Sequence, residues 1–105
     1  MLQRIRDLLG LGPKINYVEL VKQGAIILDV RTHAEYASGH IAGSINIPVD
    51  QLGRNLTKLR DKNTPIITCC ASGARSGTAR RSLLGLGYSQ VYNGGSWGAL
   101  NYKIK

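Results

Sequence analysis

Acidic side chains are nearly absent from the second half of this sequence. Residues 1–50 hold five basic and five acidic side chains, whereas residues 51–105 hold nine basic side chains and one acidic side chain, Asp61. The formal net charge of +8 therefore lies entirely in the second half. Acid or base catalysis by a carboxylate would need a side chain from the first half. The charge balance favours an anionic substrate or partner.

Long apolar runs are also absent. No run approaches the roughly 20 residues that a membrane span needs, so we expect none. Residues 1–12 have apolar side chains at helical spacing, but Arg4, Arg6 and Asp7 interrupt them, unlike the apolar region of a signal peptide. We interpret residues 1–12 as an N-terminal amphipathic segment and residues 13–105 as one globular domain. The sequence does not determine the oligomeric state, and a monomer is the default expectation.

Cysteine occurs only as the adjacent pair Cys69 and Cys70. Neighbouring alpha carbons lie about 3.8 Å apart, below the roughly 4.4–6.8 Å found across ordinary disulfides. We therefore expect free thiols in a reducing compartment, the cytoplasm. The chain has no CxxC pair and no Cys/His cluster of the kind that binds zinc. We expect no metal and no cofactor.

Apolar runs and helix-capping patterns alternate along the chain. Capping boxes beginning at Asn16 and Thr32 predict two short helices. The other expected elements are strands at 25–30, 44–48, 65–70 and 90–92, helices at 50–60 and 76–86, and a short terminal helix after a turn at Gly94-Gly95. Strands that alternate with helices indicate an α/β fold with a parallel sheet. Such sheets bind ligands beyond the carboxyl ends of their strands, which directs attention to Cys70.

The residues that follow the strand at 65–70 suggest an anion site. They are Cys70, Ala71, Ser72, Gly73, Ala74, Arg75 and Ser76. Small residues let successive backbone N–H groups converge on one point, and the following helix adds the positive end of its dipole. Arg75 adds a full charge. Each feature favours the Cys70 thiolate over the thiol, whereas Cys69 should point to the opposite face and pack in the core.

Three stretches of the chain resemble the signatures of rhodanese-like domains, in the order and spacing of that family. They are Leu28-Asp-Val-Arg31 with Glu35-Tyr36, Gly39-His40-Ile41 and residues 43–48; the loop of residues 70–76; and Gly85-Leu-Gly-Tyr88 with Val91, Gly94-Gly95 and Trp97. The resemblance extends from about Ile15 to Leu100. It implies a three-layer α/β domain with a central, mostly parallel five-stranded sheet flanked by helices.

The resemblance also implies a sulfurtransferase. Cys70 would take sulfane sulfur from thiosulfate or a related persulfide donor and pass it, as a persulfide, to cyanide, a small thiol or a protein thiol. The backbone N–H groups of residues 71–76 would cradle the persulfide, and Arg75 would hold the oxyanion of the donor. The Ser72 and Ser76 hydroxyls either assist or serve the turn and the helix cap. Asp29 and Arg31 would pair and brace the loop.

Two other functions fit part of the pattern. A cysteine phosphatase or arsenate reductase also uses a cysteine, an amide cradle and an arginine. However, four residues separate Cys70 from Arg75, one fewer than in the familiar phosphatase loop, and the loop has no acid to protonate a leaving group. A persulfide relay or regulatory binding module for a specific protein is the closer alternative. Direct nucleic-acid binding is not expected, because no aromatic stacking platform accompanies the positive charge.

Overall fold

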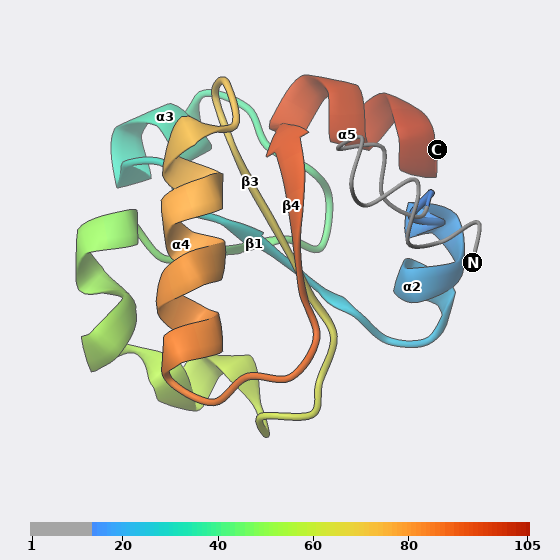
Figure 1. Ribbon diagram of the computed structural model, residues 1–105. Helices are drawn as coiled ribbons and strands as arrows, with labels where there is room; N and C mark the ends of the chain where they lie inside the picture. Colours follow the sequence, from blue (N-terminus) through green and yellow to red (C-terminus); the bar gives the residue numbers. More distant parts are fainter. Residues whose placement is uncertain (1–13) are drawn as a thin grey trace.

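The computed structural model describes residues 14–105 and arranges them in three layers around a parallel sheet (Figure 1). The sheet has the order β2-β1-β3-β4. Its strands are β1 (Ile26–Asp29), β2 (Ile45–Asn46), β3 (Ile66–Cys70) and β4 (Val91–Ser96). All three strand pairs are parallel, which confirms the predicted α/β class. The amphipathic segment expected at residues 1–12 lies outside the described residues.

The predicted five-stranded sheet is wrong in its number of strands. Residues 14–105 contribute four strands to the sheet. The chain just before β1 forms a helix, α2 (Tyr17–Lys22), and not a further strand. The Asn16 side chain caps this helix by accepting a hydrogen bond of 3.0 Å from the Glu19 backbone N–H. An N-cap satisfies one of the unpaired backbone N–H groups at the start of a helix, so the local sequence favours a helix in this segment.

Helices cover both faces of the sheet (Figure 1). One face packs against α4 (Ala74–Gly85) and the short 3-10 helices η1 (Val49–Arg54) and η2 (Leu56–Leu59). The other packs against α2 and α5 (Trp97–Ile104). Side chains alternate along the strands, so Leu28 and Cys70 enter the first core cluster while Ile27 and Cys69 enter the second. No helix within residues 14–105 is long and apolar enough to cross a membrane.

The helix predicted at residues 50–60 is replaced by the two 3-10 helices. The backbone breaks between them at Asn55, whose φ of −128° and ψ of 24° lie outside the helical region. The Asn55 side chain there donates a hydrogen bond of 2.9 Å to the Gln51 carbonyl oxygen. Asp50 does not cap a helix, because η1 begins at Val49, next to Pro48. A local side-chain bond of this kind competes with regular helix.

The last strand is longer than predicted and runs through the expected turn at Gly94-Gly95. β4 continues to Ser96, with a register shift against β3 between Thr68 and Cys70. Gly95 adopts a φ of +80°, which a glycine accommodates without strain. Gly94 is instead required by close packing. A Cβ at Gly94 would lie 2.9 Å from both the Ile67 and Leu100 side chains and from the Thr68 carbonyl oxygen.

We predict that Gly94→Ala destabilises the domain by about 1–3 kcal/mol, the usual cost of overpacking a core. Gly98→Ala, in α5, is the matched control, because a Cβ there meets no atom within 4 Å. Alanine in that helix should leave the free energy of unfolding unchanged or raise it by about 0.5–1 kcal/mol. Urea denaturation of the two variants measures the difference. Equal stabilities would contradict the packing at Gly94.

Candidate active site

The carboxyl edge of the sheet brings β1, β3 and the start of α4 together. β1 ends at Asp29 and pairs in parallel with β3, which ends at Cys70. Residues 71–73 connect Cys70 to α4. Gly73 is the N-cap of α4 and has a φ of +101°, in the left-handed region that glycine adopts readily. The connection therefore turns back over the end of its own strand.

The Cys70 sulfur is the point on which this connection converges. The Gly73 and Ser76 backbone N–H groups donate to Sγ at 3.0 and 3.4 Å, and Ser76 Oγ also lies 3.4 Å away. Burial raises the pKa of the Cys70 thiol, but the hydrogen bond with the Ser76 side chain and those from the backbone N–H groups of Ser76, Gly73 and Ser72 outweigh it. The pKa of Cys70 therefore lies below the ordinary value of a cysteine.

The residues of the loop differ in their exposure to solvent. Cys70 itself has no exposed surface, whereas Ala71, Ser72 and Ala74 are exposed. Ser76 is buried and lies three residues after the N-cap, so it does not cap α4. Its Oγ lies 3.4 Å from Cys70 Sγ and 3.1 Å from the Gly73 carbonyl oxygen, so the hydroxyl contacts both the sulfur and the turn.

Asn93 supports the loop from β4 and was not identified from the sequence. Its side-chain Oδ1 accepts hydrogen bonds from Ser76 Oγ at 2.7 Å and from the Gly95 N–H at 3.0 Å, and its Nδ2 donates to the Gly73 carbonyl oxygen at 3.2 Å. The Gly95 N–H can only donate, which fixes the orientation of the Asn93 amide. Asparagine is uncommon in strands, and that is the one signal in the sequence that could have marked it.

Arg75 forms an ion pair with Glu35. Its two terminal nitrogens, Nη1 and Nη2, meet Oε1 and Oε2 of Glu35 at 2.7 and 2.9 Å. Glu35 also completes the predicted capping box with Thr32 at the start of α3 (His33–Ala37). The Arg75 guanidinium, followed by the Thr32 backbone N–H, lowers the pKa of Glu35 to about 2. The first half of the chain thus supplies a carboxylate to the loop, and it is ionised.

Asp29 and Arg31 form a buried ion pair beside the loop. Arg31 Nη2 lies 2.7 Å from Asp29 Oδ2, and the two side chains are 5% and 0% exposed. Arg31 also donates to the backbone carbonyl oxygens of Glu35 at 3.3 Å and Gly39 at 2.7 Å. The pair therefore ties the end of β1 to the middle of α3 and to the chain just beyond its C-cap, and α3 in turn holds Arg75 through Glu35.

Cys69 differs from Cys70 in the face of the sheet to which it points and in the pKa of its thiol. It points to the other face of the sheet and packs with Ile27, Ile67 and Leu100. Burial raises the pKa of Cys69 to about 12, so this thiol stays protonated. Both cysteines are free. Among residues 14–105, no three His, Cys, Asp or Glu side chains are placed to hold a metal ion.

Comparisons with known proteins agree with the resemblance seen in the sequence. The family model described as Rhodanese-like domain matches residues 16–98. Thiosulfate sulfurtransferase PspE of Escherichia coli is 36% identical over 69 residues, which cover 65% of this chain and 66% of that protein. Thiosulfate sulfurtransferase GlpE of Ectopseudomonas mendocina is 36% identical over 75 residues, covering 71% of this chain and 68% of that protein. The chain thus spans about two thirds of the length of these relatives.

Solved structures show the same fold. The structure described as rhodanese with anions from E. coli superposes with a TM-score of 0.68 at 34% identity, covering 72% of this chain and 91% of that one. Human single-domain sulfurtransferase TSTD1 superposes with a TM-score of 0.65 at 26% identity, covering 83% of this chain and 88% of that one.

The hydrogen bonds at Cys70 predict the pH dependence of its alkylation. The rate with iodoacetamide should rise with pH as the thiolate forms and level off above the pKa. Ser76→Ala removes one group that favours the thiolate, so the midpoint should move to higher pH and the rate at neutral pH should fall. Ser82→Ala, at an exposed position of α4, is the control. An unchanged midpoint in Ser76→Ala would show that the hydroxyl does not tune this thiol.

Proposed function

The chain belongs to the rhodanese-like domain family, and from this premise we propose that it is a thiosulfate sulfurtransferase-like enzyme with Cys70 as its catalytic nucleophile. The observation that carries the proposal is the Cys70 sulfur, buried at the end of β3 and bonded by the Gly73 and Ser76 N–H groups. This environment lowers the pKa of the thiol and suits a negatively charged sulfur.

In the first step, the Cys70 thiolate attacks the outer sulfur of thiosulfate. A bond forms between the two sulfurs, the sulfur–sulfur bond of the donor breaks, and its electron pair leaves with sulfite. The products are the Cys70 persulfide anion and sulfite, so the total negative charge is conserved. The N–H groups that now bond Sγ can then bond the outer sulfur of the persulfide.

The loop supplies the groups that hold donor and persulfide. Backbone N–H groups of Ala71, Ser72, Gly73, Ala74, Arg75 and Ser76 form the proposed cradle, and the Arg75 side chain is its proposed contact for a donor oxyanion. Asp29 and Arg31 brace the cradle from β1. Because Cys70 has no exposed surface, the atoms around its sulfur must shift when a donor enters.

In the second step, an acceptor removes the outer sulfur. Cyanide attacks it, the sulfur–sulfur bond breaks, thiocyanate leaves, and the Cys70 thiolate is restored. A small thiol or a protein thiol can take the place of cyanide. A relay that serves one protein thiol would share the first step and differ only in this acceptor.

The ionisation of Glu35 disfavours a phosphatase. Glu35 is the carboxylate that the structure brings to the loop, and its pKa of about 2 keeps it deprotonated near neutral pH. It therefore cannot donate a proton to a leaving alkoxide. We also propose the cytoplasm as the compartment, because a reducing compartment keeps both free cysteines as thiols. Cell fractionation tests the location.

We expect thiosulfate to add one sulfur atom to the wild-type protein and to Cys69→Ser, and none to Cys70→Ser. Intact-mass spectrometry measures the addition, and cyanide should reverse it with release of thiocyanate. Cys69→Ser is the matched control because the two cysteines are neighbours on opposite faces of the sheet. A sulfur gain that survives in Cys70→Ser would refute the mechanism. Persulfide formation with negligible cyanide turnover, rescued by a protein thiol, would identify a relay.

A further inference from the structure

The contact between Glu35 and Arg75 has a consequence for the choice of sulfur donor. We infer that Glu35 is a specificity-determining residue: its carboxylate occupies the guanidinium that would otherwise attract anionic donors to Cys70. The inference rests on the proposed function for its meaning in catalysis. The attraction of anions to the Cys70 thiolate can be measured without sulfur transfer.

The geometry leaves Arg75 little capacity for a second anion. Both of its terminal nitrogens are bonded to the two oxygens of Glu35, in the paired arrangement that a guanidinium would use for an oxyanion. A donor must therefore displace the carboxylate or bind Arg75 in a weaker way. Each side chain of the pair is 36% exposed, so solvent can reach the contact and an anion could compete for it.

The carboxylate also cancels the local charge. A free Arg75 would present one positive charge beside the cradle, whereas the ion pair presents none. Arg31 does not replace it, because Asp29 neutralises it in the same way. Arg80 donates to the Val91 carbonyl oxygen at 2.8 Å, along β4 and away from the loop. Attraction of an anion to the sulfur is therefore left mainly to the backbone N–H groups.

The effect of the Glu35 carboxylate on a sulfur donor should depend on the charge of that donor. Thiosulfate carries two negative charges, an organic persulfide carries one, and both must approach an anionic sulfur beside the Glu35 carboxylate. Repulsion grows with the charge of the donor. Glu35 therefore favours less charged donors and lowers the affinity of the enzyme for thiosulfate.

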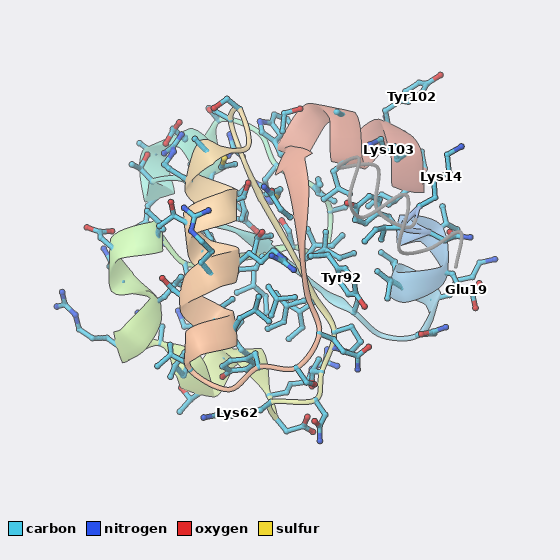
Figure 2. All side chains as sticks on the ribbon, in the orientation of Figure 1. Lys14, Glu19, Lys62, Tyr92, Tyr102 and Lys103 are labelled. Carbon is cyan, nitrogen blue, oxygen red and sulfur yellow. The ribbon has the colours of Figure 1, made fainter. Side chains whose placement is uncertain are left out.

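The variant Glu35→Gln removes the charge of the carboxylate and can keep the fold of α3. Glutamine also serves as the third residue of a capping box, so Glu35→Gln can keep the bonds to Thr32 at the start of α3. Glu19 provides a matched control, because it lies at the corresponding position of α2, three residues after the N-cap Asn16. Figure 2 shows Glu19 on the opposite side of the molecule from α3. Glu19→Gln makes the same change in net charge far from Cys70.

The test compares iodoacetate with iodoacetamide as alkylating reagents for Cys70. In both reactions the thiolate forms a bond to carbon and iodide leaves, but only iodoacetate is an anion. The ratio of the two rate constants thus reports anion attraction at the sulfur, while changes in thiol pKa or loop opening affect both rates alike. Glu35→Gln should raise the ratio about two- to fivefold, the range expected for a partly exposed ion pair. Glu19→Gln should leave the ratio unchanged.

A double variant shows whether Glu35 acts through Arg75. Arg75→Ala should lower the ratio, and adding Glu35→Gln to Arg75→Ala should change it by a smaller factor than in the wild-type background. Glu35→Ala is the second variant if Glu35→Gln does not fold, and the same rise is expected. An unchanged ratio in the folded variant, or an equal rise with and without Arg75, would overturn the inference.

Thiosulfate kinetics then connect the ratio to catalysis. Glu35→Gln should lower KM for thiosulfate by a factor similar to the change in the alkylation ratio, with little change in kcat. If no variant turns over thiosulfate but the ratio shifts as expected, the proposed function fails while the control of anion attraction by Glu35 stands. If turnover is normal and the ratio does not shift, the proposed function stands and this inference fails.

Discussion

The hydrogen bond from the Gly73 N–H to the Cys70 sulfur is the interaction on which the site depends. Gly73 has a positive φ directly before α4, which sets the direction in which the chain leaves the loop and enters the helix. The same turn brings the Ser76 N–H and hydroxyl to the sulfur. A buried thiol would ordinarily have a raised pKa, but these hydrogen bonds lower the pKa of Cys70 below its usual value.

Two contacts from distant parts of the chain hold that turn in place. Asn93, on β4, bonds both the Gly73 carbonyl oxygen and the Ser76 hydroxyl. Glu35, on α3, holds Arg75 at the start of α4. α3 is in turn held by the buried pair of Asp29 and Arg31. The loop is therefore supported by β4 and by β1 together with α3. This support holds the Gly73 and Ser76 N–H groups in position to bond the Cys70 sulfur.

Local electrostatics and net charge contribute differently to anion binding. The net charge of +8 comes from the second half of the chain. Exposed charges more than roughly 8–10 Å from the site are largely screened at ordinary salt. Within the site, Arg75 and Arg31 are each paired with a carboxylate. If a donor binds at the sulfur as proposed, the backbone N–H groups and the balance between Glu35 and Arg75 set its attraction more than the total charge of the protein does.

The sequence by itself determined the alternation of strands and helices, the helix cap at Asn16, the capping box at Thr32, and the cysteine-to-serine loop, because these depend on neighbouring residues. It did not determine the break at Asn55, the extension of β4 through Gly94 or the number of strands, since these follow from side-chain bonds and packing between distant segments. The same holds for the site. Cys70 was evident from its local pattern, but only the tertiary structure brought Asn93 to Ser76 and Glu35 to Arg75, because these pairs are separated by 17 and 40 positions along the chain.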